Sequence, residues 1–445
     1  MTNHEILQLL LSEVIPAIGC TEPIAVALCT ARAKEILGAE PDTITVYLSK
    51  NVYKNALAVG IPNTGMTGLP IAIALGATVG KSEYMLEVLR DATPEAVAYA
   101  KQYMLRVPAT IKVDYEAPSL LYIHVEVSAN GKTAQATIID EHTHFVTPNT
   151  QDSVSNSEAS NTQSPINGTP SESSDLNLRR VYDFATSIET SDLAFLLEGA
   201  QMNTAAAETS FANQYGHGLG RLLRPNSEAS NSPQGVQYPI VQALSAQSLF
   251  GDTLFTKIIS YTCGACDARM SGAMVQVMSN SGSGNQGISC SIPVYLYAKE
   301  NHCTEEQALR ALALSNLTVI YIKQSLGRLS ALCGCVVAAT GSAAGMTYLM
   351  GGSYDEITYA IKNMIANISG MICDGAKPGC ALKVTSGVSP AIFSAYLAMQ
   401  HSYADSTEGI VEDDIDRTIR NLTRIGHDGM KVTDDLILDI MTHKQ

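Results

Sequence analysis

Two long stretches of this chain carry no charged side chain, and they limit the folds open to it. The first lies between Arg269 and Lys299, and the second between Arg328 and Asp355. Both are rich in Gly, Ser, Asn and Ala rather than in Leu, Ile and Phe, so their transfer into lipid would be unfavourable. A glycine spacing within the second stretch, at 341 and 345, would let two helices approach closely. We therefore expect both stretches to form buried helices in a globular core rather than membrane spans.

The composition points to a folded protein that acts on small molecules. The 445 residues are 46% hydrophobic and 16% charged, which is typical of a globular protein rather than a disordered one. Against 28 Lys and Arg residues stand 43 Asp and Glu residues, which gives a formal net charge of −15. Such a surface does not favour nucleic acid or an anionic membrane. We expect a small-molecule partner, with no nucleic-acid or membrane partner.

The ten cysteines indicate a reducing compartment. At this length they do not form the dense disulfide framework of a small secreted domain, and no basic segment or cleavage site accompanies the short apolar run after His4 and Glu5. The expected location is therefore the cytoplasm. Clustered cysteines there more often serve a metal or a reaction than a disulfide.

The chain divides into four parts, and its predicted fold class is α+β. β-Branched alternation predicts strands at 43–48, 110–115, 120–128 and 133–139, with an Asn130-Gly131 turn, so a small antiparallel sheet is expected. Helical periodicity prevails after about residue 180. The predicted parts are N-terminal helices packing on a catalytic body (1–42), a small α+β lobe (43–147), a disordered polar insertion (148–178) and a mainly helical catalytic domain (179–445). A second polar patch spans 225–236.

Cysteines that could bind a metal occur in several short clusters. They are Cys263 and Cys266 in TCGACD, Cys333 and Cys335 in LCGC, and Cys373 and Cys380 in CDGAKPGC. Two such pairs could hold a structural zinc ion, although these spacings are unusual for zinc. An iron–sulfur cluster tolerates varied spacing and needs only thiolates that converge in a shielded site. Buried free cysteines that pack as small hydrophobic side chains are the remaining interpretation.

The run from Met278 to Gly287 could hold an anion. Its Gly and Ser residues leave several backbone N–H groups unobstructed before an apolar helix, which suits a carboxylate or a phosphate. No Lys-Ser or Lys-Thr follows, so the run is not a Walker A loop. His217 and His302 are candidate general bases, with a structural role as the alternative.

Five strings together resemble the L-cysteine desulfidase family, which is similar to the alpha-chain region of bacterial iron–sulfur L-serine dehydratases. They are GCTEP at 19–23, GIPNTG at 60–65, DARM at 267–270, GSGNQG at 282–287 and CDGAKPGC at 373–380. The resemblance implies a cytoplasmic lyase that converts L-cysteine and water into sulfide, ammonia and pyruvate. It implies an oxygen-sensitive [4Fe-4S] cluster in place of pyridoxal phosphate, and a homo-oligomer, with a dimer expected.

The resemblance also assigns site residues. The cluster ligands would be Cys333, Cys373 and Cys380, with Cys335 as an alternative to the first. Cys20 would lie in the active site as a base or as a weak fourth contact. A base role requires a thiolate, whose pKa the helix starting near Pro23 would lower.

The remaining candidates concern the substrate and the reaction. Ser283, Asn285 and Gln286 are expected to bind the substrate carboxylate, and Arg269 could pair with it, unless Arg269 is instead paired with Asp267 or another acid. Cys263 and Cys266 depart from the family pattern, so we interpret them as incidental. The alternatives to a cysteine desulfidase are an L-serine dehydratase with the same cluster chemistry and a non-enzymatic metal-binding protein.

Overall fold

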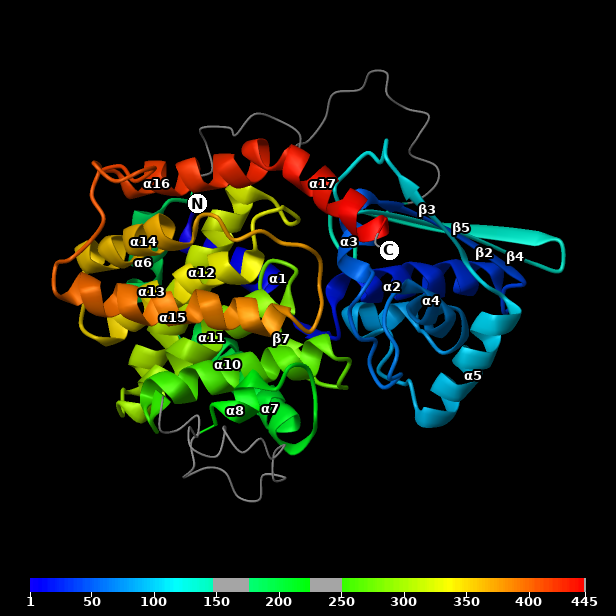
Figure 1. The fold of residues 1–445 in the computed structure, drawn as a ribbon, viewed down its shortest axis with the longest axis horizontal. Coiled ribbons are helices and arrows are strands. Elements are labelled where there is room, and N and C mark those ends of the chain that lie inside the picture. Colours follow the sequence, from blue (N-terminus) through cyan, green and yellow to red (C-terminus); the bar gives the residue numbers. More distant parts are fainter. Residues whose placement is uncertain (147–175, 225–249, 444–445) are drawn as a thin grey trace.

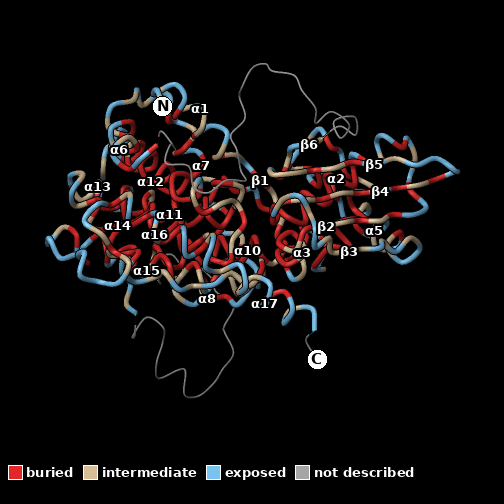
Figure 2. The backbone as a smooth tube through the Cα atoms, turned by 90° about the horizontal axis from the view of Figure 1, so that it is seen from above, coloured by how far each residue is buried: buried red, intermediate tan, exposed pale blue. Residues whose placement is uncertain are grey.

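The computed structural model describes residues 1–146, 176–224 and 250–443. They form a helical body and a small lobe built on a sheet, which lie side by side (Figure 1). Each part has its own buried core, so the chain is organised around two packing centres (Figure 2). The predicted α+β class is confirmed.

The small lobe places a sheet against helices. Its helices and its strands are α2 (Thr21–Leu37), α3 (Lys50–Ala56), α4 (Leu69–Thr78), η1 (Ser82–Glu87), α5 (Pro94–Arg106), β2 (Thr43–Ser49), β3 (Thr110–Asp114), β4 (Tyr122–Ala129), β5 (Lys132–Ile139) and β6 (Phe145–Val146). The strand order is β3-β2-β4-β5-β6. Helix α2 packs on β4 and β5, and α4 packs on α2 in turn.

The sheet is mixed, whereas the sequence predicted an antiparallel one. Strands β2, β4, β5 and β6 pair antiparallel, but β3 pairs parallel to β2, with Thr45 opposite Thr110. The reason is the connection: α3, α4, η1 and α5 lie between β2 and β3, and a helical crossover returns the chain to the end at which β2 began. Only the hairpin at Asn130-Gly131 is the tight turn that the sequence predicted.

The body is assembled from helices that cross one another around α13. Its elements are α1 (Asn3–Glu13), β1 (Pro16–Ile18), α6 (Leu178–Ser187), η3 (Thr190–Leu193), α7 (Ala194–Ala212), α8 (Leu219–Leu222), α10 (Leu254–Met270), β7 (Gln276–Met278), α11 (Gly284–Glu300), α12 (Glu305–Leu326), α13 (Gly334–Leu349), α14 (Tyr354–Ile368), α15 (Cys380–Met399), α16 (Ile415–Arg424), η5 (Ile425–Gly429) and α17 (Lys431–Thr442). Helix α13 packs against α11, α12, α14 and α15. No helix of the described residues is long and apolar enough to cross a membrane.

The first 42 residues are divided between the two cores, which differs from the prediction. Ile6 and Leu10 of α1 are buried in the body, but α2 contributes Ile24 and Leu28 to the core of the small lobe. Helix α2 also begins at Thr21, so Pro23 lies in its first turn and does not interrupt it. Strand β1 between the two helices pairs with β7, which ties this connection to the body.

The two polar segments predicted from the sequence lie almost wholly outside the described residues. Residues 148–175 of the first and all of the second, 225–236, are not described. The last three residues of the first insertion differ from the prediction. Leu176 and Leu178 are buried in the core of the body, and the Asn177 side chain caps α6 by accepting from the backbone N–H of Arg180. Apolar side chains that can be buried therefore end the insertion three residues earlier than its composition suggested.

The close helix approach expected from the glycine spacing at 341 and 345 is confirmed. A Cβ atom at Gly341 would overlap the Ser315 carbonyl oxygen of α12, and one at Gly345 would lie 2.9 Å from the Ala311 carbonyl oxygen and 2.8 Å from a Val294 methyl group of α11. The two glycines let α13 lie against both neighbouring helices. This contact holds the centre of the body.

Gly341→Ala is therefore expected to destabilise the protein. The added methyl group has no space, and overpacking of this kind costs about 1–3 kcal/mol. Gly429→Ala is the matched control, because a Cβ atom there meets nothing within 4 Å. Urea denaturation followed by circular dichroism measures both variants. An unchanged free energy of unfolding for Gly341→Ala would contradict the packing argument.

Candidate active site

A pocket lies where the small lobe meets the body, and four helices begin at it. Helices α2, α11, α13 and α15 start there, and Cys20, Ser283, Cys333 and Cys380 from these four starts line it. None of the four starts has a side-chain cap hydrogen bond, whereas α1, α12 and α14 each have a capping box. Uncapped first-turn N–H groups and the helix dipole favour an anion. The four helix starts are therefore suited to an anion in this pocket.

The three predicted cluster ligands line this one pocket. Cys333 ends the loop before α13, Cys373 lies in the loop after α14, and Cys380 is the first residue of α15. The first two segments are joined by an antiparallel bridge between Leu332 and Ile372, in which the Cys333 N–H donates to Met371 at 2.9 Å and the Cys373 N–H to Ala331 at 2.6 Å. Two segments about 40 residues apart in sequence are therefore held in fixed register.

Cys335 also lines the pocket, and its Sγ lies 3.1 Å from the Sγ of Cys333. The hydrogen bond between the two thiols lowers the pKa of Cys333 to about 7 and raises that of Cys335. Cys333 is thus the thiol of the pair that ionises more readily. The geometry leaves both sulfurs in the pocket, so the choice between them stays a prediction.

The other cysteine pair takes no part in this pocket. Cys263 and Cys266 are buried within α10, and the Cys263 thiol donates to the Ala381 carbonyl at 3.5 Å. Burial raises the pKa of Cys263 to about 12. Within the described residues, no group of three or more His, Cys, Asp or Glu side chains could hold a metal ion. The zinc interpretation therefore finds no support among those residues.

Cys20 is the N-cap residue of α2, but its thiol is not activated by that position. Its Sγ donates to Glu22 Oε2 at 3.2 Å. Burial and the neighbouring Glu22 carboxylate raise the pKa of Cys20 well above its usual value, against the lowering expected from the helix dipole. Burial opposes ionisation of Glu22, but the hydrogen bonds that its carboxylate accepts from Cys20 and Thr21 favour the charged form, and the pKa of Glu22 is lowered. At neutral pH the pair is a thiol beside a carboxylate.

Arg269 is a buried guanidinium with no acid as its partner in the described residues. Only 1% of it is exposed, its Nη1 donates to Asn285 Oδ1 at 3.0 Å, and its Nε and Nη2 have no hydrogen-bond partner. Asp267 does not pair with it, because that carboxylate accepts from the backbone N–H of His217 at 3.1 Å. The alternative of an Arg269–Asp267 pair is therefore wrong. A buried cation with free donors calls for an anionic ligand.

The predicted carboxylate-binding residues lie beside Arg269. Ser283, Asn285 and Gln286 line the pocket from the first turn of α11, and the Oε1 of Gln286 is buried without a partner. Gly284 leaves the space that the Arg269 guanidinium occupies, since a Cβ atom there would overlap it. Gly284 of GSGNQG therefore lets the Arg269 side chain come close to the backbone, in addition to leaving the N–H groups unobstructed.

The pocket holds more positive than negative charge. Arg269, Lys323 and Arg328 line it, against Glu22 as the one carboxylate of the described lining. Lys323 donates to the Arg328 carbonyl at 3.1 Å, and its burial lowers its pKa to about 8. Arg328 forms an ion pair with Glu13 at 2.8 Å. The lining thus favours anions in the same sense as the helix starts.

His142 is a pocket residue that the sequence analysis missed. It lies between β5 and β6, is 5% exposed, and its Nε2 is buried without a partner. Burial lowers its pKa to about 4, so the imidazole is neutral at pH 7. His217 and His302, the histidines that the sequence suggested, are exposed and do not line the pocket. The available signal was a histidine three residues after the end of a predicted strand.

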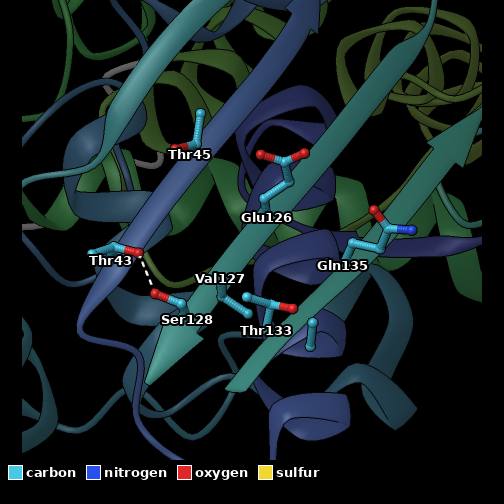
Figure 3. Close-up of a pocket in the computed structure, with 8 residues that line it drawn as sticks. Thr43, Thr45, Glu126, Val127, Ser128, Thr133 and Gln135 are labelled. Atoms are coloured by element: carbon cyan, nitrogen blue, oxygen red, sulfur yellow. Dashed lines mark hydrogen bonds between the residues drawn. The ribbon is translucent and has the colours of Figure 1, made fainter. Parts of the chain in front are cut away.

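A second hollow, on the open face of the sheet, lacks these features. Figure 3 shows it between β2, β4 and β5, with the Thr43 hydroxyl 2.6 Å from that of Ser128. Its lining is Thr, Ser, Gln, Ala and Val with Glu126, and none of the predicted site residues belongs to it. The junction pocket is the better candidate.

The chain is similar to known proteins over most of its length. The family model for the serine dehydratase alpha chain matches residues 83–439. A UPF0597 protein of Phocaeicola vulgatus is 55% identical over 443 residues, covering 100% of this chain and 98% of the relative. A UPF0597 protein of Porphyromonas gingivalis is 46% identical, covering 100% and 99%. One of Aeromonas hydrophila is 39% identical, covering 99% and 96%.

The buried neutral His142 predicts a stability that depends on pH. An unfolded histidine binds a proton at its ordinary pKa of 6.5, but the folded one does so only near pH 4. Its contribution to the free energy of unfolding is complete above about pH 6.5. This contribution falls by about 3 kcal/mol in total as the pH drops from about 6.5 through about 4. Urea denaturation of the native protein and of His142→Gln over this range should show a steeper loss for the native protein. Parallel curves would contradict the burial argument.

Proposed function

Because this chain belongs to the serine dehydratase alpha chain family, we propose that it is an iron–sulfur-dependent lyase that converts L-cysteine and water into hydrogen sulfide, ammonia and pyruvate. One observation carries the proposal: the thiols of Cys333, Cys373 and Cys380, an unpartnered guanidinium and a neutral imidazole line the same pocket. The family supports a lyase of the serine dehydratase type, and the motif resemblance supports cysteine as its substrate.

The donor set of the pocket fits a [4Fe-4S] cluster. Thiolates are the protein ligands of such clusters, and each binds a different iron, so they need not converge on one point as the ligands of a single ion do. Cys333, Cys373 and Cys380 would hold the cluster. With three protein ligands, the fourth iron would supply a Lewis acid for the substrate.

The substrate would be held at its two charged groups. The Arg269 Nε and Nη2 donors and the first-turn N–H groups of α11 would bind the carboxylate. Glu22, which accepts from Asn55 Nδ2 at 3.1 Å and from the Cys20 thiol, would bind the ammonium group. Donors and acceptor lie in one pocket, so a zwitterionic amino acid would match both.

We assign His142 as the general base that removes the α-proton of the substrate. Its neutral imidazole has a lone pair available in the pocket, whereas the Cys20 thiol is protonated and directed to Glu22. As the proton moves to the imidazole, the Cα–H electrons form the Cα=Cβ bond and the Cβ–S bond breaks, releasing sulfide. The resulting enamine tautomerises to an imine, which water hydrolyses to pyruvate and ammonia. Cys20 then orients Glu22, with a weak cluster contact as the remaining possibility for it.

L-Serine is the second candidate substrate. The description of the matching family favours it, and elimination of a β-hydroxyl group needs the same carboxylate, ammonium and base sites. A protein that holds metal for stability alone fits less well. Such a site would not need the unpartnered donors of Arg269 beside its thiols.

Loss of a thiol is expected to abolish cluster binding. Anaerobically purified protein should contain about four iron atoms and about four acid-labile sulfides per chain. Cys373→Ala and Cys380→Ala should lose most of this iron and all lyase activity, because each removes a ligand. Cys303→Ala is the matched control, since that thiol is outside the pocket. Full iron content and activity in either pocket variant would refute the assignment.

A comparison of the two amino acids distinguishes the candidate substrates. We expect kcat/KM to be higher for L-cysteine than for L-serine. Arg269→Gln should raise KM for either substrate by about 10- to 100-fold, because it removes a charge-assisted pair with the carboxylate. A higher kcat/KM for serine would identify a serine dehydratase, and an unchanged KM in the variant would exclude Arg269 from carboxylate binding.

A further inference from the structure

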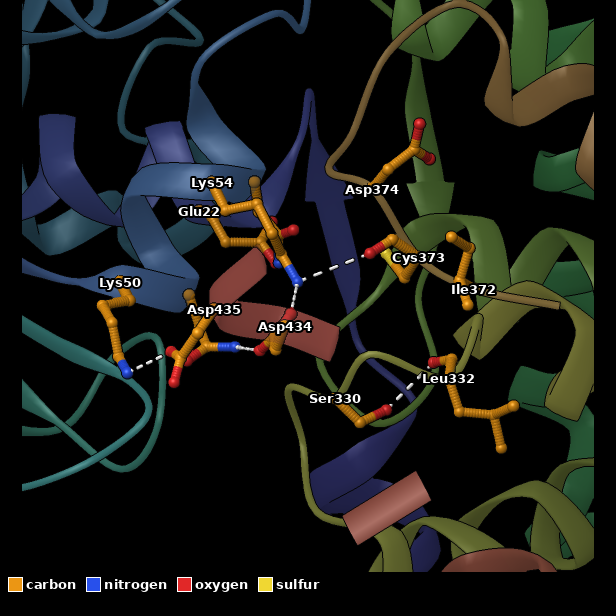
Figure 4. Close-up of polar contacts among 12 residues, drawn as sticks. Glu22, Lys50, Lys54, Ser330, Leu332, Ile372, Cys373, Asp374, Asp434 and Asp435 are labelled. Atoms are coloured by element: carbon orange, nitrogen blue, oxygen red, sulfur yellow. Dashed lines mark hydrogen bonds and ion pairs between the residues drawn. The ribbon is translucent and has the colours of Figure 1, made fainter. Parts of the chain in front are cut away.

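Helix α3, helix α17 and the loop that contains Cys373 are far apart in the sequence but meet at Lys54. Lys54 of α3 is buried, with 2% of its side chain exposed, and its ammonium group forms an ion pair with Asp434 of α17 (Figure 4). The same ammonium group lies 3.5 Å from the carbonyl oxygen of Cys373. Asn51 of α3 donates to the second oxygen of Asp434. The small lobe, the last helix and the Cys373 loop are thus joined through one lysine.

The backbone next to Cys373 is confined by the same elements. Gly375 has a φ of +85°, and a Cβ atom there would overlap the Lys54 carbonyl oxygen and lie 3.2 Å from the Met441 methyl group of α17. Only a glycine can follow this path without strain. The loop therefore passes between α3 and α17, and both helices limit where Cys373 can lie.

Helix α17 has little buried apolar surface to hold it against the rest of the protein. Ile437 and Leu438 are its only buried residues, whereas Val432, Leu436 and Ile440 are 79%, 56% and 54% exposed. It crosses from the body to the small lobe along the outside of the molecule (Figure 1). A helix with little buried apolar surface is among the first parts of a protein to open locally.

The ion pair with Asp434 stabilises the buried ammonium group of Lys54. A buried ammonium group without its carboxylate is unfavourable, so it moves toward water or draws water in when the carboxylate is lost. Either change removes the donor at the Cys373 carbonyl. The second ion pair of α17, between Lys50 and Asp435, lies at the surface, with 34% and 59% of the side chains exposed, and does not contact the loop.

We propose that Lys54 is a positioning residue for Cys373, and that α17 is a strap that secures the cluster-binding loop when Asp434 docks on Lys54. The proposal rests on the proposed function, because it assigns a purpose to the placement of a cluster ligand. It predicts that the last helix controls how firmly the protein retains its iron, although it contributes no ligand of its own.

The first test measures cluster retention in the loaded, full-length protein. Asp434→Asn should lose iron to an excess of a chelator at least about tenfold faster than the native protein, a change that corresponds to about 1.4 kcal/mol. Asp435→Asn, on the same helix, should remain within about twofold, because its pair is exposed. Asp434→Glu keeps the carboxylate and should lie between the two. Equal rates for Asp434→Asn and Asp435→Asn would overturn the proposal.

The second test needs no cluster and no activity. In the cluster-free protein, the alkylation rate of Cys373 by iodoacetamide, followed by peptide mass spectrometry, should rise in Asp434→Asn and stay unchanged in Asp435→Asn. If the native protein takes up no iron, the proposed function fails, while this rate still decides whether α17 secures the loop. If Asp434→Asn does not fold, Asp434→Glu is compared with the native protein in its place, and an equal alkylation rate for the two overturns the strap.

Discussion

The junction pocket depends on four helices that begin at the same point without side-chain caps. Elsewhere, α1, α12 and α14 satisfy their first N–H groups with their own side chains. At the pocket the four helix starts lack such caps, as α3, α4, α7 and α17 also do, and the positive ends of four helix dipoles at one pocket would favour an anion there. The burial of the uncharged segments around α11 and α13 supplies the stability that keeps these ends together.

The two lobes divide the work of this pocket. The body contributes the cysteine thiols, that of Cys20 among them, and the basic groups, whereas the small lobe contributes Glu22, Asn55 and His142. The start of α2 reaches the pocket because that helix is anchored in the core of the small lobe. The relative position of the lobes therefore sets the distance between the groups proposed to hold the cluster and the group proposed to take the proton.

Local sequence patterns predicted the parts of this structure that are local in cause. Strand alternation, the Asn130-Gly131 turn and the cysteine-containing strings each depend on neighbouring residues, and the resemblance brought Cys333, Cys373 and Cys380 to attention before their convergence was visible. The parallel pairing of β3 and the packing of α2 on the sheet depend on contacts between distant segments. The lowered pKa of His142 and the raised pKa of Cys20 both result from burial. Residue spacing in the chain does not show how far a side chain is excluded from water.

The pocket combines residues from distant parts of the sequence. Cys20 lines it together with the two segments that the bridge between Leu332 and Ile372 joins. A growing polypeptide cannot complete such a pocket until Cys380 has been synthesised and released from the ribosome, which leaves the earlier thiols exposed during translation. If the pocket holds the proposed cluster, iron would enter after the segment that carries Cys380 has been synthesised, and not during the first steps of folding.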